Sequence, residues 1–156
     1  MKDWNVVVTV YQDGYTRVLH ALEKLGTVDR SPYYNVLAMT VDDPVALLEV
    51  LERQTDEDPA LYDAISRIAP ATERFSFISA DDFKAKARAI LQVWSKSLAG
   101  RTFHARLHRR GEADELPSPE IERFIDDQVI AATTAIGQAA SVSFNDPDAV
   151  IAIDTI

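Results

Sequence analysis

The sequence contains no cysteine, which excludes thiol catalysis, disulfide bonds, iron–sulfur clusters and zinc sites built on thiolates. It has only five glycines, and no two of them are spaced as in the common phosphate-binding loops. No apolar run approaches the roughly 20 residues that span a bilayer. The N-terminus also lacks the basic lead and the cleavage site of a secretory signal. We therefore expect a cytoplasmic protein that makes no use of a membrane.

The composition predicts a folded chain. Its 156 residues suffice for one ordinary domain or two small ones. Hydrophobic residues make up 47% and charged residues 26%, a balance typical of globular proteins and not of disordered ones. The formal net charge of -9 would by itself argue against a polyanionic partner.

The distribution of charge changes that conclusion. The segment from Lys84 to Arg110 holds eight of the 16 lysines and arginines and no aspartate or glutamate. The rest of the chain carries the other eight basic residues against all 25 acidic ones. The chain is therefore a charge dipole, and its basic segment is a candidate for contact with an anionic partner.

Hydrophobic patterning over the first half of the chain predicts the element order β-α-β-β-α-β. The expected strands are residues 4–10, 28–31, 36–41 and 73–78. The second helix is expected to begin at Pro44. Leu47, Leu48 and Leu51 are expected to face its inner side. This order is that of the split βαβ unit, an antiparallel sheet with two helices on one face, and predicts a ferredoxin-like domain over residues 1–78.

The second half begins with a predicted helix from Ser79, capped through Asp82, to Gly100. Its apolar stripe consists of Phe83, Ala87, Ile90, Leu91, Trp94 and Leu98. The residues expected to face solvent or a partner are Lys84, Arg88, Gln92, Ser95 and Lys96. The remaining predicted elements are a polar loop at 111–117, a helix at 118–138 with Ser118 as its N-cap, a brief strand at 142–144 and a final strand at 149–156.

Residues 101–110 alternate and predict a strand with one apolar and one cationic face. Phe103, Ala105 and Leu107 are expected to point into the core. The side chains expected on the other face are His104, Arg106, His108 and Arg110. These groups repel one another, and their segment contains no acid. Because the planar fork of arginine suits phosphate, an anionic partner explains this strand better than a solvated face, unless the Asp126-Asp127 region folds over to supply acids.

The titratable residues do not form a catalytic pattern. His104 and His108 are four residues apart, but along a strand this separates them by roughly 13 Å, too far for a shared metal. The acidic pairs are Asp42-Asp43, Asp81-Asp82 and Asp126-Asp127. The first two fall where helices begin and the third on the outward face of the long helix, so capping and solvation account for them. We therefore predict no catalytic residue, no metal site and no cofactor.

Three motifs in order resemble the THUMP domain, an RNA-binding module of tRNA-modifying proteins. The run similar to the family's Gly-Lys-Thr-Phe-x-Val-Arg-x-Lys-Arg-x-Gly is Gly100-Arg101-Thr102-Phe103-His104-Ala105-Arg106-Leu107-His108-Arg109-Arg110-Gly111. The helix start Ser118-Pro119-Glu120-Ile121-Glu122 is similar to the family's Ser-x-Glu-x-Glu. The family's Asn-Pro-Asp ending resembles Asn145-Asp146-Pro147-Asp148, followed by Val150, Ile151 and Ile153. The chain most resembles the THUMP-only adaptors that accompany the tRNA cytidine acetyltransferase.

The resemblance implies an α+β fold, with the ferredoxin-like domain packed on a THUMP-like α/β module over residues 79–156. It also implies a non-enzymatic role, gripping the single-stranded 3′ acceptor end of tRNA while a separate modifying enzyme, such as an acetyltransferase, performs the chemistry. The expected RNA contacts are Lys84, Arg88, Lys96, Arg101, Arg106, His108, Arg109 and Arg110. The family's sheet continues with one more strand, which we expect to be missing or supplied otherwise, because this chain stops at Ile156.

Three other functions are compatible with the pattern. A ferredoxin-like regulatory domain would bind a small molecule and no RNA. An enzyme acting on RNA would modify or cleave it unaided, although the sequence supplies no catalytic group for this. An assembly subunit would use the cationic strand to bind an acidic protein.

Overall fold

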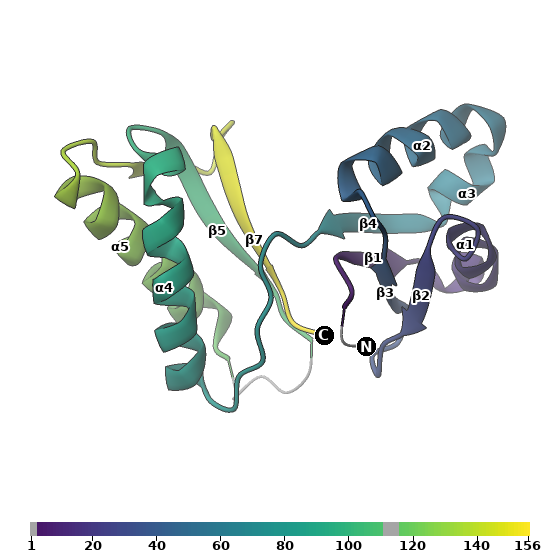
Figure 1. Ribbon diagram of the computed structural model, residues 1–156, viewed down its shortest axis with the longest axis horizontal. Helices are drawn as coiled ribbons and strands as arrows, with labels where there is room; N and C mark the ends of the chain where they lie inside the picture. The colour runs from purple at the N-terminus through teal and green to yellow at the C-terminus, as the bar shows by residue number, and fades with distance from the viewer. Residues whose placement is uncertain (1–2, 111–115) are drawn as a thin grey trace. The chain divides into compact units, whose positions relative to one another are not determined.

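The computed structural model of the chain describes residues 3–110 and 116–156. It divides into two compact units, Met1–Arg74 with Ile156 and Phe75–Thr155. Each unit has a hydrophobic core of its own, so each is described by itself (Figure 1). In the described residues no helix combines the length and the apolar character needed to cross a membrane.

The first unit is an antiparallel sheet with helices. Its elements are β1 (Val6–Val10), the short 3-10 helix η1 (Gln12–Gly14), α1 (Tyr15–Leu22), β2 (Thr27–Arg30), β3 (Val36–Thr40), α2 (Pro44–Glu57), α3 (Pro59–Asp63) and β4 (Ile65–Pro70). The strand order is β2-β3-β1-β4, and every pairing in this sheet is antiparallel. This is the predicted ferredoxin-like arrangement.

Alternation along β1 and β3 places one set of side chains in the core. Val6, Val8, Leu37 and Met39 are fully buried, and they belong to one cluster with residues of α1 and α2. A close approach requires glycine at position 14, because a Cβ there would lie 2.1 Å from the Cβ of Ala64. Chain segments 50 residues apart therefore meet with no room for a side chain.

Two expectations for the first unit were wrong. Leu48 is 37% exposed, whereas Leu47 and Leu51 are buried on the inner side of α2. The last strand is β4 at 65–70 and not residues 73–78, because Ile65–Pro70 pairs with β1. Phe75 and Phe77, which lie within the predicted strand, pack against the core of the second unit. The rings of Phe75 and Phe77 pack against Phe83 in the second core, with centroids 5.4 and 5.5 Å away.

The second unit has a parallel sheet with two long helices. Its elements are α4 (Ala80–Leu98), β5 (Thr102–His108), α5 (Ser118–Ala135), β6 (Ser141–Val142) and β7 (Ala149–Asp154). The strand order is β6-β5-β7, and both neighbours run parallel to β5. The helices α4 and α5 lie on the same side of β5 and β7 (Figure 1). Together with the antiparallel sheet of the first unit, this arrangement confirms the predicted α+β class.

The helix α4 is capped as predicted. The Ser79 hydroxyl accepts a hydrogen bond from the Asp82 backbone N–H at 3.1 Å, and the Asp82 carboxylate accepts one from the Ile78 N–H at 3.1 Å. One residue on this helix contradicts the prediction. Ser95 is buried and not turned toward solvent, and its hydroxyl donates to the Gln92 carbonyl at 2.7 Å. That bond satisfies the hydroxyl, so the apolar stripe tolerates it.

The helix α5 differs from its prediction at both ends. Pro117 is the N-cap residue, without a side-chain bond, and Ser118 is already helical. The helix ends at Ala135, and the chain then turns at Gly137, whose φ is 82°. Residues 111–115 of the predicted polar loop lie outside the described residues.

Candidate nucleic-acid interface

The strand β5 has two different faces. Phe103, Ala105 and Leu107 are buried in the core with α4 and α5. The side chains of His104 and Arg106 alternate with them and therefore point away from the helices. We call this side of the sheet the open face, formed by His104 and Arg106 of β5 and by Val150 and Ala152, their pairing partners on β7.

Arg106 occupies the middle of the open face. It is exposed, and its partner in the register is Ala152, which is also exposed and carries no charge. Among the residues that the structure describes, no carboxylate lies within ion-pairing distance of its guanidinium. A cation in this setting is available to an anionic ligand.

The imidazole of His104 is held by the segment that follows β6. Its Nδ1 lies 3.1 Å from the carbonyl oxygen of Ser143. Its ring lies 5.4 Å from the ring of Phe144, with 35° between the planes. Phe144 is 75% exposed, and Val150, which pairs with His104, is 52% exposed. An aromatic and apolar surface therefore adjoins Arg106.

Sequence reasoning missed Phe144, which it assigned to a brief strand. The strand β6 ends at Val142, and Phe144 follows it in a polar loop. The only signal was a lone aromatic residue among Ser143, Asn145 and Asp146. Pairing with His104 depends on a contact 40 residues away along the chain, which local patterning does not contain.

Two predicted contacts lie in the helical layer and not on the open face. Lys84 forms an ion pair with Glu120 of α5. The Arg88 Nε donates to the Gln128 Oε1 at 2.9 Å, and its guanidinium lies 5.6 Å from the Phe124 ring centroid. Because α4 and α5 cover the other side of the sheet, these two cations are separated from Arg106 by the sheet itself.

Of the other predicted cations, Lys96 belongs to α4 and the rest lie at the two ends of β5. Lys96, in the last turn of α4, and Arg101, just before the strand, are both exposed. His108 is the last residue of β5, so Arg109 and Arg110 lie beyond it, and the prediction of a strand to residue 110 was wrong. His108 and Arg109 are partly buried.

Arg110 has an acidic partner on the neighbouring strand. Its Nη1 lies 2.9 Å from the Asp154 Oδ1 of β7, and the two side chains are only 15% and 9% exposed. The arginine also donates to the Thr155 carbonyl at 3.3 Å. These contacts hold the two strand ends together and reduce the charge that Arg110 presents to a ligand.

Two acids from α5 reach β5, but they bind its backbone and not its cations. The Asp126 Oδ1 accepts a hydrogen bond from the Ala105 N–H at 3.0 Å, and the Glu122 Oε1 accepts one from the Leu107 N–H at 2.8 Å. The short strand β6 pairs only with Thr102 and Phe103, so these carboxylates occupy the edge of β5 where β6 is absent.

The expectation that Asp126 faces outward was therefore wrong. Partial burial raises the pKa of the Asp126 carboxyl above its ordinary 3.8, an effect opposed by the hydrogen bond from Ala105 and reinforced by the charge of Glu122. In the described ranges no cluster of three or more histidine, aspartate and glutamate side chains is arranged to hold a metal ion.

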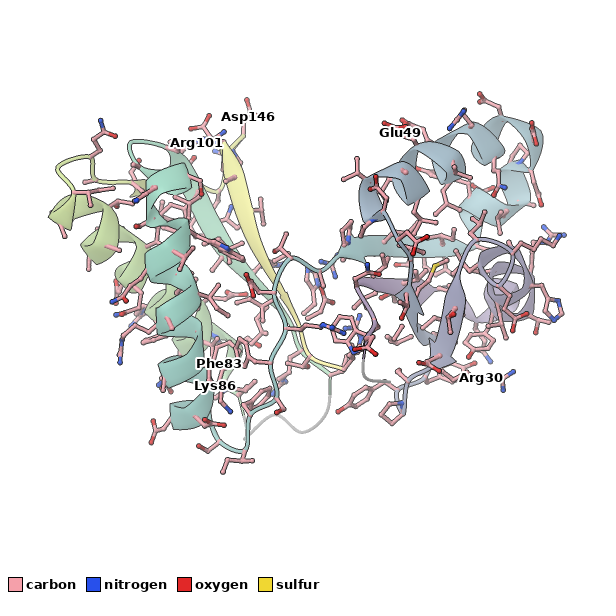
Figure 2. The ribbon with its side chains drawn as sticks, in the orientation of Figure 1. Arg30, Glu49, Phe83, Lys86, Arg101 and Asp146 are labelled. Atoms are coloured by element: carbon pink, nitrogen blue, oxygen red, sulfur yellow. The ribbon has the colours of Figure 1, made fainter. Side chains whose placement is uncertain are left out.

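Two of the motifs that suggested a family meet in space. The Asp148 Oδ2 accepts from both the N–H and the hydroxyl of Thr102 at 2.9 Å, and the Thr102 oxygen accepts from the Asp148 N–H at 3.0 Å. These bonds and the nearby charge of Arg101 lower the pKa of Asp148. Figure 2 shows Arg101 and Asp146 at the same end of the sheet. The start of β5 is thus tied to the turn that precedes β7.

The first unit has a shallow hollow at the β2–β3 hairpin. It measures about 460 Å³ and is lined by Tyr15, Arg30, Ser31, Pro32, Tyr33, Tyr34 and Asn35. The Arg30 guanidinium lies 6.0 Å from the Tyr15 ring centroid. The buried side-chain oxygen of Asn35 has no hydrogen-bond partner among the residues that the structure describes.

Comparison with known proteins identifies the fold. No family model matches the sequence. A curated relative, the tRNA sulfurtransferase of Klebsiella pneumoniae (strain 342), is 30% identical over 112 residues, which cover 69% of this chain and 22% of the relative. The chain thus spans about a fifth of the length of the curated relative that it matches.

Two solved structures share the architecture over nearly the whole chain. The match to PH1313 from Pyrococcus horikoshii has a TM-score of 0.62 at 15% identity. It covers 97% of this chain and 50% of the PH1313 chain. The match to a 4-thiouridine synthetase, solved as an RNA complex with bound ATP, has a TM-score of 0.59 at 14% identity. It covers 99% of this chain and 39% of the synthetase chain. These matches confirm the fold class, a ferredoxin-like sheet with a THUMP-like α/β unit.

Proposed function

We propose that this chain binds tRNA through the open face and presents the acceptor end to a separate modifying enzyme. The observation that carries the proposal is the exposed guanidinium of Arg106 on the side of the sheet opposite α4 and α5. Support comes from the curated relative named tRNA sulfurtransferase and from the structural neighbour solved with RNA. The chain itself would supply no catalytic group.

The physical basis is electrostatic positioning. Cations that meet phosphates release condensed counterions, and this release supplies much of the affinity of proteins for RNA. Because the chain carries a net charge of -9, its acidic parts repel RNA, and only the basic segment attracts it. Single-stranded ends suit such a surface, because their phosphates and bases are both accessible.

The environments of the cations rank their roles. Arg106 and Arg101 are exposed and would provide the main phosphate contacts, whereas Lys96 is exposed on α4, in the helical layer, and would contribute less. His108 and Arg109, which are partly buried, would add smaller contributions at the far end of β5. Lys84, Arg88 and Arg110 are already bound to side chains of this protein, so they would contribute less. The basic surface is therefore smaller than the eight residues expected from composition.

Two enzyme classes are candidates for the partner. The motif resemblance favours an acetyltransferase that acts on cytidine. The curated relative favours an enzyme that transfers sulfur to tRNA. Mass spectrometry of nucleosides from tRNA incubated with the chain and each enzyme would distinguish them, because only the true partner gains product yield from the added chain.

The test of RNA binding is a fluorescence titration of tRNA with and without its 3′ terminal nucleotides. We expect Arg106→Glu to weaken binding of intact tRNA by about 10-fold or more, because one attractive contact becomes repulsive. Removal of the 3′ nucleotides should weaken binding by the wild-type protein and have a smaller effect on the variant.

The matched control is Arg53→Glu, the same change of charge on the exposed face of α2 in the first unit. Its affinity should stay within about twofold of wild type. Equal losses in both variants would mean that only net charge matters. Full affinity of the Arg106 variant would contradict the proposed surface.

One observation favours the small-molecule alternative, namely the aromatic hollow at the β2–β3 hairpin. Under that alternative, a ligand would raise the thermal unfolding temperature of the protein, and tRNA would have no effect. Thermal unfolding therefore distinguishes the two functions: a small-molecule ligand raises the unfolding temperature under one, and tRNA raises it under the other.

A further inference from the structure

We propose that Phe144 and His104 form a stacking platform for one unpaired nucleobase, with Arg106 holding the phosphate beside it. The inference rests on the proposed RNA-binding function and assigns one subsite within it. None of the contacts expected from sequence includes Phe144. Three features in and beside the open face would form this subsite: the exposed ring of Phe144, the fixed ring of His104 beside it and the adjacent cation of Arg106.

The first feature is the exposure of Phe144. Its side chain is 75% exposed beside the open face. A single exposed apolar residue is ordinary on protein surfaces, so exposure alone carries no conclusion. Phe144, however, lies against another aromatic ring, 5.4 Å away and tilted by 35°. Two rings in this geometry already form the beginning of a stack that a third flat ring can extend.

The second feature is that the platform is preorganised. The Nδ1 of His104 lies 3.1 Å from the carbonyl oxygen of Ser143, the residue that precedes Phe144. The same short segment therefore orients both rings. The Ser143 N–H donates to the Phe103 carbonyl at 2.8 Å, and the Ser143 hydroxyl donates to the Asn145 carbonyl at 2.9 Å. A ligand that binds these rings has little ordering cost to overcome.

The third feature is the distance to Arg106. His104 and Arg106 are two residues apart on β5 and point to the same side, so their Cα atoms are separated by about 6.6 Å. A base resting on the rings can therefore place its own phosphate near the guanidinium. The neighbouring side chains on β7 are Val150 and Ala152. Both are small and uncharged, so they leave the space between the His104 ring and the Arg106 guanidinium open to a ligand.

Three acids near the open face are engaged in hydrogen bonds or an ion pair, and the exposed cation that an anion can meet there is Arg106; Asp146, two residues after Phe144, is exposed in the same loop. Asp148 accepts hydrogen bonds from Thr102, Asp154 pairs with Arg110, and Asp126 accepts from the Ala105 backbone. An acidic peptide could pair with the Arg106 guanidinium but would make no stacking contact with the rings of Phe144 and His104. A nucleotide matches both, because it combines a flat π system with a phosphate.

The platform should accept only unpaired bases. Bases inside a duplex are stacked on one another and cannot reach a protein ring. Stacking also tolerates different bases, since each has a π face, so we expect affinity to depend on strandedness more than on base identity.

The test compares two RNA hairpins of the same stem, one blunt and one with a single-stranded 3′ tail that carries 2-aminopurine. For the tailed hairpin, we expect Phe144→Ala to weaken binding by about 10-fold, the effect of losing one base stack. The fluorescence quenching seen with the wild-type protein should disappear. Affinity for the blunt hairpin should stay within about twofold.

Further variants separate stacking from folding. Phe144→Trp should retain affinity and quenching, whereas Phe144→Leu should lose both, because it keeps an apolar side chain without a ring. The matched control is Val93→Ala, also 75% exposed but located on α4 in the helical layer. It should behave as wild type with both hairpins.

The outcomes distinguish this inference from the proposed function. If Phe144→Ala keeps full affinity and quenching while Arg106→Glu loses binding, the platform is refuted and RNA binding stands. If the Phe144 variant loses tailed and blunt hairpins equally, its effect is not stacking, and the platform is again refuted. If the wild-type protein binds neither hairpin nor tRNA, both proposals fail.

Discussion

At the scale of single residues, similar side chains in the basic segment have different fates. Arg106 presents its guanidinium on the open face, whereas Arg110, four residues later, binds Asp154 at 2.9 Å. Lys84 is neutralised by Glu120 across the helical layer. Counting basic residues thus overestimates the surface that RNA can use, because partners distant in sequence engage some of them.

Asp126 illustrates the opposite case, an acid that serves the fold and not a ligand. Because partial burial raises its pKa above the ordinary 3.8, the folded state binds a proton on this carboxyl more readily than the unfolded state. The stability that this difference contributes is present at acid pH and is lost as the pH rises through the raised pKa.

We therefore predict a pH-dependent effect of Asp126→Asn. An amide still accepts the bond from the Ala105 N–H but does not ionise. The free energy of unfolding of this variant, relative to wild type, should increase between about pH 4 and pH 7. Urea denaturation at several pH values measures this difference, with Asp56→Asn on the exposed side of α2 in the first unit as the control. A constant or decreasing difference would contradict the assignment.

At the scale of elements, the start of β5 is connected to the turn before β7 by Thr102 and Asp148. The Thr102 hydroxyl donates to the Asp148 carboxylate at 2.9 Å and accepts from the Asp148 N–H at 3.0 Å. These bonds join positions 46 residues apart. They hold the loop of Phe144 between two strand starts, which supports the platform proposed for it.

Thr102→Val tests this connection. The change keeps the β-branched shape that a strand favours but removes the hydroxyl, so we predict a loss of about 1 kcal/mol in the free energy of unfolding. The quenching of 2-aminopurine should also weaken, because the loop is held less firmly. The comparison is Thr16→Val on the exposed side of α1. No difference between the two variants in either measurement would rule out this role for Thr102.

Local periodicity predicted most elements, but it failed where distant pairing decides. The alternation of Phe103, Ala105 and Leu107 correctly predicted the buried face of β5. The same rule misplaced the strand at 73–78, because Phe75 and Phe77 alternate to meet Phe83 and not to pair with β1. Alternation of apolar and polar residues along a segment shows which of its sides is apolar. It carries no information about the strand with which the segment pairs.

The site was less predictable than the fold for the same reason. Arg106 was expected on the cationic face of its strand and is exposed there. The partners of Lys84 and Arg110 come from α5 and β7, and the role of Phe144 depends on His104. Each of these contacts joins residues at least 36 positions apart, so no local pattern contained them.

At the scale of the whole molecule, this is an acidic protein with one basic region. The net charge of -9 opposes the approach of RNA in general, and the basic segment provides the exception. RNA should therefore bind weakly and slowly when it approaches the acidic parts of the molecule. It should bind well only when its phosphates meet the basic segment. The binding should therefore depend strongly on salt, because it is carried by a few phosphate contacts.

The most direct measurement of this claim is the affinity for tRNA as a function of salt concentration. If about five cations meet phosphates, the logarithm of affinity should fall against the logarithm of salt with a slope near -3.5, taking ~0.7 for each single-stranded contact. Arg106→Glu should reduce the steepness of this slope by about 0.7 or more. An affinity that does not change with salt, or an unchanged slope in the variant, would contradict the central role of Arg106.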